Sequence, residues 1–116
     1  MRVLLVDDDQ LIRFVHQMFL ERAGHEVVGV AEEENQAVDL ALSLKPDVVV
    51  MDIRLENGTN GIEAMRRIQQ VANIPAVYVS GNSDKRTMEE ASQTNQWSFL
   101  VKPITQDELE TALLAK

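Results

Sequence analysis

The sequence predicts an α/β fold, a three-layer sandwich in which helices cover both faces of a five-stranded parallel sheet. Short aliphatic runs and segments with helical spacing alternate five times along 116 residues. Several of the aliphatic runs are apolar without alternation, which is typical of parallel strands buried on both faces. Because strands joined by right-handed crossover helices run parallel, the chain winds into one doubly wound sheet. A chain of this length predicts one domain, residues 1–116.

The predicted strands are short and rich in β-branched residues. They are RVLLV (2–6), EVVGV (26–30), DVVVM (47–51), PAVYV (75–79) and FLVKP (99–103). Ligands of doubly wound sheets bind beyond the carboxyl ends of the strands, where the strand order switches. The residues that follow these five runs are therefore where we expect the chemistry.

The segments between the strands carry apolar residues at helical spacing. The stripes are Leu11-Val15-Met18, Ala37-Ala41-Leu44, Ile62-Met65-Ile68-Ala72 and Leu109-Ala112-Leu113. Segment 83–95 is polar, with only Met88 and Ala91 as apolar anchors, which predicts a short and exposed helix. Gly24 follows the first stripe and predicts a C-terminal cap.

The amino-acid composition excludes some classes of function and favours others. The net charge of −8, from 19 acidic and 11 basic residues, argues against binding of nucleic acid by this chain and favours divalent cations or basic partner surfaces. An acidic surface that only keeps the domain soluble is the alternative. The absence of cysteine excludes disulfides and thiol chemistry, and the opening MRVLLVDDD is too short for a signal peptide or membrane span. We expect a cytoplasmic protein.

Charged and hydroxyl side chains follow four of the predicted strands. They are Asp7, Asp8, Asp9, Asp52, Ser80 and Lys102. Carboxylate oxygens suit Mg²⁺, whereas a lysine and a serine hydroxyl can bind phosphoryl oxygens. Two carboxylates at ~4 Å repel each other by roughly 4 kcal/mol at an effective dielectric constant near 20, so solvent, a helix N-terminus or a bound cation must offset the repulsion. The set predicts a site for phosphate on an acid, with a metal ion.

Four motifs, in order and over essentially the whole chain, resemble the receiver domain of bacterial two-component response regulators. They are LLVDDD, VVVMDIRL, VYVSGN and FLVKPI. The resemblance implies the flavodoxin-like, CheY-like topology and a signalling phosphoacceptor that catalyses only its own phosphotransfer and dephosphorylation. The implied donor is a sensor histidine kinase or a histidine phosphotransfer protein.

The resemblance also implies roles for single residues. Asp52 matches the phosphoacceptor, which attacks the phosphohistidine of the donor. Mg²⁺ or Mn²⁺ is held by Asp7, Asp8, Asp52 and the backbone carbonyl of Arg54, with Asp8 as the direct ligand and Asp7 acting through water. Because the contact of Arg54 is made by its backbone, its side chain is free to vary. No organic cofactor is implied.

The remaining matched residues lie at the last two strands. Lys102 faces the phosphoryl oxygens, and the following Pro103 often forms a cis bond in this family. Ser80 and Phe99 match the hydroxyl and aromatic residues that move together after phosphorylation. The surface expected to change is formed by the fourth helix, fifth strand and fifth helix, around residues 83–112, and it would bind an output partner or a second copy of the chain.

The sequence departs from the common receiver pattern at several positions. After Asp52, Glu56 replaces the usual proline and Gly61 arrives one residue late, which leaves the geometry of the loop open. Glu34 stands where the family often has glycine, and NQWSF, with Trp97, replaces the usual Gly-Ala before the fifth strand.

The other charged residues receive structural interpretations. Asp9 is expected to cap the helix that begins at Gln10. We predict surface or turn positions for His16 and His25, and a solvated helix start, stabilised by the helix dipole, for the acidic run 32–34.

Two other functions stay open. A binding module could keep the fold and signal without phosphorylation, although the acidic pair and the acceptor favour a receiver. A small α/β enzyme could use Asp52 as nucleophile on a diffusible phosphate ester, which would need a further acid–base carboxylate or a cap domain. We expect no effector domain within these residues, so output comes from protein contacts or from a part outside the chain.

Overall fold

A computed structural model describes residues 1–114 of the protein. The strands are β1 (Arg2–Val6), β2 (Glu26–Ala31), β3 (Val48–Asp52), β4 (Ala76–Ser80) and β5 (Gln96–Val101). The helices are α1 (Gln10–Arg22), α2 (Glu34–Leu44), the short 3₁₀ helix η1 (Glu56–Gly58), α3 (Gly61–Gln69), α4 (Lys85–Ser92) and α5 (Gln106–Leu114).

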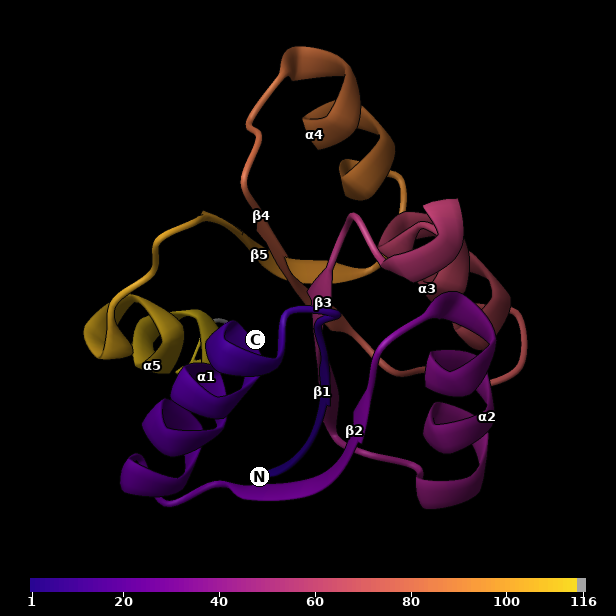
Figure 1. The fold of residues 1–116 in the computed structure, drawn as a ribbon. Coiled ribbons are helices and arrows are strands. Elements are labelled where there is room, and N and C mark those ends of the chain that lie inside the picture. Colours follow the sequence, from indigo (N-terminus) through magenta and orange to yellow (C-terminus); the bar gives the residue numbers. More distant parts are fainter. Residues whose placement is uncertain (115–116) are drawn as a thin grey trace.

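The five strands form one parallel sheet in the order β2-β1-β3-β4-β5, as the sequence predicts. Helices α1 and α5 pack together on one side of the sheet, and α2 and α3 on the other, with α4 beyond α3 (Figure 1). The chain starts at β1 and proceeds first to one edge and then to the other. The strand order therefore switches between β1 and β3, and the carboxyl ends of these two strands open the crevice where ligands of such folds bind.

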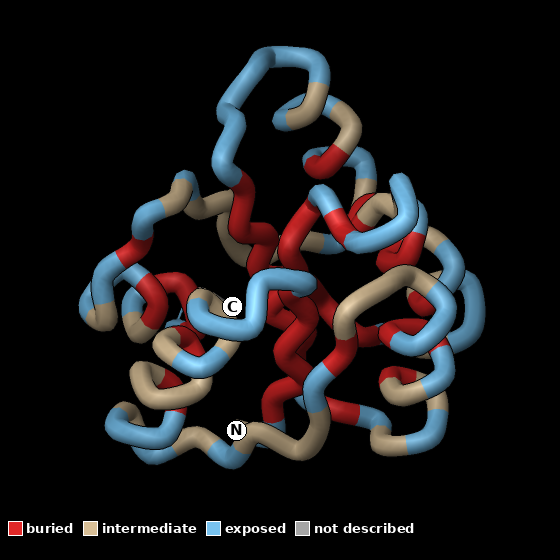
Figure 2. Tube along the Cα trace, viewed as in Figure 1, coloured by how far each residue is buried: buried red, intermediate tan, exposed pale blue. Residues whose placement is uncertain are grey.

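The core consists of two apolar layers, one on each face of the sheet. Leu5 and Val50 belong to the layer beneath α1 and α5, whereas Leu4 and Met51 belong to the layer beneath α2 and α3. Strands β3 and β4 are buried along their whole length, at the centre of the molecule (Figure 2). Each fully buried side chain of this kind stabilises the fold by about 1.5–3 kcal/mol, so the central strands are a rigid base for the residues at their ends.

The predicted helix faces are confirmed for α2, α3 and α5, but the prediction for α1 is wrong. Leu11 is 71 % exposed, and the buried residues of this helix are His16 and Leu20. The predicted surface position of His16 is also wrong, because it is 4 % exposed and stacks on Phe19 with ring centroids 6.2 Å apart. A histidine counts as polar in a hydrophobic pattern, so the pattern placed the buried face on the wrong side of the helix.

The last third of the chain differs from the prediction in two further respects. Helix α4 is short and mostly exposed, as predicted, but of its two predicted anchors only Ala91 is buried, while Met88 is 43 % exposed. Strand β5 begins at Gln96 and not at Phe99. The polar start of β5 is held in the sheet by pairing with β4, which aliphatic content alone does not reveal.

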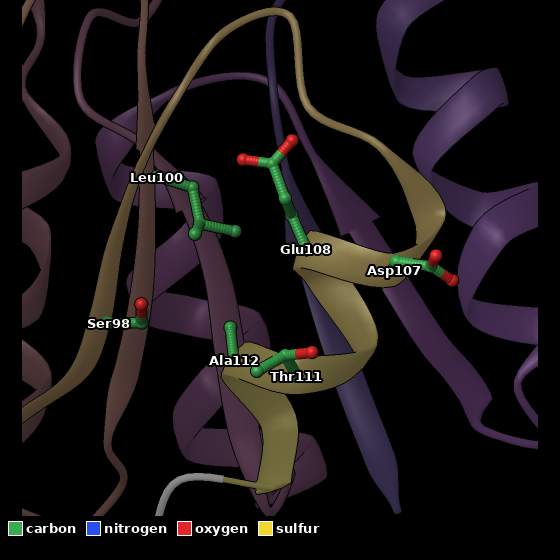
Figure 3. A pocket seen from close by; sticks show the side chains of 6 residues that line it. All are labelled: Ser98, Leu100, Asp107, Glu108, Thr111 and Ala112. Carbon is green, nitrogen blue, oxygen red and sulfur yellow. The ribbon is translucent and has the colours of Figure 1, made fainter.

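A shallow hollow of about 350 Å³ lies between β5 and α5 (Figure 3). It is lined by Ser98, Leu100, Asp107, Glu108, Thr111 and Ala112. Strand β5 is an edge strand of the sheet, and its residues Ser98 and Leu100 form one wall of the hollow. None of the helices within residues 1–114 combines the length and the apolar character needed to cross a membrane.

Candidate functional site

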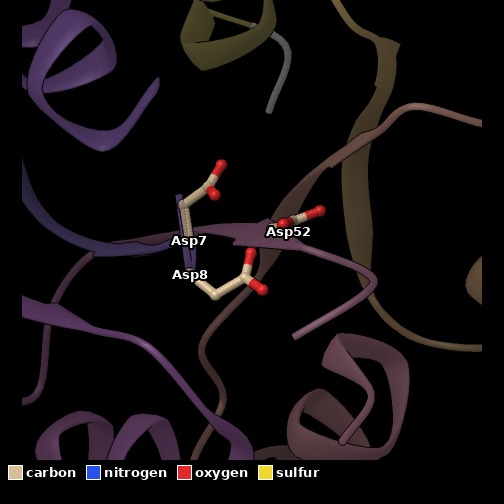
Figure 4. A group of neighbouring side chains, drawn as sticks. All are labelled: Asp7, Asp8 and Asp52. Atoms are coloured by element: carbon tan, nitrogen blue, oxygen red, sulfur yellow. The ribbon is translucent and has the colours of Figure 1, made fainter. Parts of the chain in front are cut away.

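Three aspartates meet at the carboxyl end of the sheet (Figure 4). Asp7 and Asp8 follow β1, and Asp52 is the last residue of the adjacent strand β3. One carboxylate oxygen from each residue lies within 4.8 Å of the others. Asp7 and Asp52 are buried and Asp8 is exposed. The structure therefore brings together the acidic residues that the sequence predicts.

Lys102 lies directly after β5 and reaches into this acidic group. Its Nζ is 3.0 Å from Oδ2 of Asp7 and 3.3 Å from Oδ2 of Asp52. Its backbone N–H donates to the carbonyl of Ser80 at 2.8 Å, and the Lys102–Pro103 peptide bond is cis. The ammonium group thus offsets part of the repulsion between two buried carboxylates.

The site changes the protonation of its own members. Burial, reinforced by the negative charge of Asp7, raises the pKa of Asp52 to about 7, and the Lys102 ammonium opposes this rise. Burial alone would lower the pKa of Lys102, but attraction to Asp52 and Asp7 outweighs it and raises that pKa. Lys102 is therefore a permanent cation, whereas Asp52 gains or loses its proton near neutral pH.

An open cleft of about 490 Å³ lies over these side chains. It is lined by Asp8, Asp9, Ile12, Asp52, Arg54, Gly81, Asn82 and Lys102. The cleft has room for a phosphoryl group together with a hydrated cation. Its lining includes carboxylates, which can bind the cation, and Lys102, which can bind the phosphoryl oxygens.

The loop after β3 folds back on itself beside the cleft. Arg54 forms an antiparallel bridge with Asn60, and the flanking backbone bonds are Gly61 N–H to Ile53 carbonyl (2.7 Å) and Leu55 N–H to Thr59 carbonyl (3.1 Å). Neither bond uses the carbonyl of Arg54, which is free to face a ligand. The loop contains η1, where Asn57 adopts a left-handed conformation with φ of 59°.

Gly61 begins α3 directly behind the carboxyl end of β3. A Cβ atom at this position would overlap the backbone carbonyl oxygen of Asp52 and lie 2.7 Å from Cγ of Met51. Only glycine permits this close approach, so α3 can pack its first turn against the residue that carries the candidate nucleophile.

Ser80 and Phe99 are not among the residues that line the cleft. Ser80, the last residue of β4, is 2 % exposed, and its Oγ accepts a hydrogen bond from the N–H of Asn82 at 3.1 Å. Phe99, in β5, is half-buried, and its ring lies 6.4 Å from that of Tyr78 at an angle of 48°. Ser80 thus contacts Lys102 through its backbone carbonyl, and Phe99 packs against the core layer beneath α2 and α3.

Asp9 caps α1, as predicted: its Oδ1 accepts from the N–H groups of Leu11 (3.0 Å) and Ile12 (3.1 Å). The acidic run before α2 is not simply a solvated helix start. Glu33 caps the helix, and Glu34 pairs with Arg67 of α3 at 3.0 Å. His25 lies in the turn before β2, as predicted.

Sequence reasoning missed Arg13. Its Nη1 lies 2.9 Å from the carbonyl oxygen of Asp7 and 3.2 Å from Oε1 of Glu32, so it joins the loops after β1 and β2. An arginine in an amphipathic helix is ordinarily solvated, and only the closeness of these two loops at the sheet end could have indicated another position.

Comparisons with known proteins agree with this geometry. Residues 3–114 match the family model of the response regulator receiver domain. Chemotaxis protein CheY of Thermotoga maritima is 34 % identical over 113 residues, which cover 97 % of this chain and 93 % of CheY. The crystal structure of the response regulator domain of T. maritima CheB superposes with a TM-score of 0.87 at 32 % identity, covering 99 % of this chain and 95 % of that domain.

A longer relative is the transcriptional regulatory protein PdtaR of Mycobacterium tuberculosis, which is 34 % identical over 112 residues. These residues make up 97 % of this chain and 54 % of PdtaR, so the chain spans about half the length of that relative. The family model covers nearly the whole chain. The chain belongs to the response regulator receiver domains of two-component signalling.

Proposed function

We propose that this receiver domain accepts a phosphoryl group on Asp52 and releases it again, as a signalling element and not as a turnover enzyme. One observation supports this assignment above the others. The Asp52 carboxylate opens into the cleft between the acidic pair that follows β1 and the Lys102 ammonium, 3.3 Å away. No other described carboxylate has both kinds of partner in a cleft.

The transfer needs little from the protein beyond position and charge. An oxygen of Asp52 forms a bond to phosphorus while the bond between phosphorus and the imidazole nitrogen of the phosphohistidine donor breaks. The Lys102 ammonium, which lies beside Asp52, stabilises the negative charge on the phosphoryl oxygens. A sensor histidine kinase or a histidine phosphotransfer protein is the proposed donor, and the cytoplasm the proposed compartment.

The acidic group fits Mg²⁺ or Mn²⁺, because hard divalent cations prefer oxygen ligands. Asp7, Asp8, Asp52 and the backbone carbonyl of Arg54 would hold the ion. When bound, the ion neutralises the charge that accumulates between the carboxylate and the phosphoryl group. Both oxygens of Asp7 are already engaged, with the N–H of Asp9 (2.9 Å) and with Lys102, whereas Asp8 is exposed. We therefore assign direct contact to Asp8 and contact through water to Asp7.

We further propose that Ser80 and Phe99 transmit the modification. The Ser80 hydroxyl accepts from the N–H of Asn82, so a rotation of this side chain toward a phosphoryl group on Asp52 would change its contact with the loop before α4. Phe99 could then move against Tyr78. The surface that would change comprises α4, β5 and α5 and includes the hollow of Figure 3. An output partner, or a second copy of the chain, would bind there.

The test is phosphorylation by acetyl phosphate in the presence of Mg²⁺, followed by intact mass measurement. We expect one phosphoryl adduct on the wild-type protein, none on Asp52→Asn, and none after chelation of the metal. An equal adduct on Asp52→Asn would disprove the assignment. Hydrolysis of a small phosphate ester far beyond one equivalent would instead support the enzyme alternative.

A further inference from the structure

Arg13 links two loops that border the candidate metal site. It lies in the first turns of α1, and its side chain is only 14 % exposed. One guanidinium nitrogen, Nη1, donates to the carbonyl oxygen of Asp7 at 2.9 Å and lies 3.2 Å from Oε1 of Glu32. The contact to Asp7 is thus made to the backbone carbonyl and does not involve the Asp7 carboxylate, whose two oxygens contact the N–H of Asp9 and Lys102.

The carbonyl of Asp7 belongs to the peptide that joins Asp7 to Asp8. Among residues 1–114 the side chain of Asp8 has no hydrogen bond or ion pair, so its direction depends on the backbone that carries it. Its neighbours are two further carboxylates, whose repulsion favours turning it away from the cleft. A hydrogen bond to the preceding carbonyl restricts the rotation of this peptide and keeps the Asp8 side chain directed toward Asp52.

Glu32, which pairs with Arg13, is held through its backbone, whereas its side chain is 47 % exposed. Its own N–H donates to Oε1 of Gln36 at 2.9 Å, and its carbonyl accepts from the N–H of Glu56 at 3.4 Å. Glu56 begins η1, in the same loop that contains Arg54. A continuous series of contacts therefore runs from the backbone of Asp7, through Arg13 and Glu32, to the loop whose carbonyl we propose as a metal ligand.

We propose that Arg13 is a positioning residue for the cation site, and that the Arg13–Glu32 pair holds the Asp7–Asp8 peptide in the orientation that binds Mg²⁺. This inference rests on the proposed function of the acidic group. Residues that orient metal ligands from outside typically change metal affinity by about 10- to 100-fold when they are lost.

A positioning role for Arg13 and simple electrostatics predict opposite changes in Mg²⁺ affinity when Arg13 is replaced by alanine. Removal of a positive charge beside an acidic site should strengthen Mg²⁺ binding, if charge alone matters. We expect Arg13→Ala to weaken Mg²⁺ binding about tenfold. Arg86 provides the matched control, because Arg86→Ala removes the same charge from an exposed side chain of α4 that pairs with Glu90.

The experiment titrates each metal-free protein with Mg²⁺ alone by calorimetry, and follows amide hydrogen exchange of the Asp7–Asp9 segment without metal. Arg13→Ala should bind more weakly and exchange faster in this segment. Glu32→Gln, which keeps the bond from Arg13 to Asp7, should show a smaller weakening, and Arg86→Ala neither effect. If Arg13→Ala does not fold, Glu32→Gln and Arg13→Lys replace it in these measurements. Arg13→Lys keeps a single donor nitrogen.

Unchanged or tighter Mg²⁺ binding by Arg13→Ala, with wild-type binding intact, would overturn the role of Arg13 and leave the proposed function standing. Absence of Mg²⁺ binding by the wild-type protein would instead overturn the metal site itself, and the positioning role with it.

Discussion

The Nζ atom of Lys102 lies 3.3 Å from Oδ2 of Asp52, and it bridges the carboxyl ends of β5 and β3 across the intervening strand. The same nitrogen contacts Asp7 at 3.0 Å. In the protein alone, this ammonium group therefore provides the positive charge that allows buried carboxylates to approach one another. The relationship connects the stability of the site to its chemistry, because any change at one residue alters the protonation of the other.

Replacement of Lys102 by methionine should raise the pKa of Asp52 further. The ammonium lowers this pKa by attraction and by a hydrogen bond, whereas burial and Asp7 raise it. Methionine keeps the side chain long and removes only the charge. Titration of the Asp52 carboxyl carbon by NMR in metal-free buffer measures the effect, and an unchanged pKa would show that the contact with Lys102 does not exist in solution.

The stability of the metal-free protein should decrease as pH rises through the range in which Asp52 titrates. Its pKa is about 7 in the folded protein and near 3.8 in an unfolded chain, so between these values the folded state holds a proton that the unfolded state has released. The contribution of the neutral Asp52 carboxyl to the free energy of unfolding is fully present below about pH 4, and it is lost as pH rises through about 7.

Asp52→Asn removes this titration and is the reference for the measurement. Urea unfolding of both proteins should show that the stability of the wild type relative to Asp52→Asn falls by on the order of a few kcal/mol over that range, at about 1.4 kcal/mol per pKa unit. A constant difference between the two proteins would contradict the raised pKa.

The consecutive aspartates Asp8 and Asp9 should differ in their effect on Mg²⁺ binding. Mg²⁺ should raise the unfolding temperature of the wild-type protein, because a ligand that binds only the folded state stabilises it. Asp8→Ala should abolish this gain. Asp9→Ala should cost about 1 kcal/mol through loss of the α1 cap and keep the gain. Loss of the Mg²⁺ effect in Asp9→Ala but not in Asp8→Ala would reverse our assignment.

Gly61→Ala should destabilise the protein although alanine favours helices. In a helix interior alanine is preferred over glycine by about 0.8–1.0 kcal/mol, and at the first residue of α3 this value is an upper limit. However, the Cβ of an alanine at position 61 would overlap the carbonyl oxygen of Asp52. Such overpacking typically lowers the free energy of unfolding by about 1–3 kcal/mol. Gly81→Ala is the matched control, since a Cβ there meets no atom within 4 Å. Equal stability of the two variants in urea unfolding would refute the close approach.

The parallel sheet and the acidic end of the fold were predictable from short-range patterns. Buried parallel strands read as aliphatic runs, and the rule that ligands bind at their carboxyl ends identified Asp7, Asp8, Asp52 and Lys102 before any contact was known. The N-terminal cap by Asp9 was predictable for the same reason, because capping depends on local backbone donors.

Features that depend on the packing of distant segments were not predictable. The burial of His16 depends on how α1 rotates against the sheet, and the contact of Arg13 with Asp7 and Glu32 depends on the meeting of two loops. The early start of β5 at Gln96 depends on hydrogen bonding to β4. In each case a polar residue lies where its own hydrophobicity would not place it.

The most direct test of the account locates the phosphoryl group chemically. The protein is incubated with acetyl phosphate and Mg²⁺, reduced with borohydride, which converts an aspartyl phosphate to homoserine, and mapped by peptide mass spectrometry. We predict homoserine at position 52 and unmodified aspartate at positions 7, 8 and 9. Homoserine at one of the three N-terminal aspartates, or at no position, would contradict the assignment of Asp52 as the phosphoacceptor.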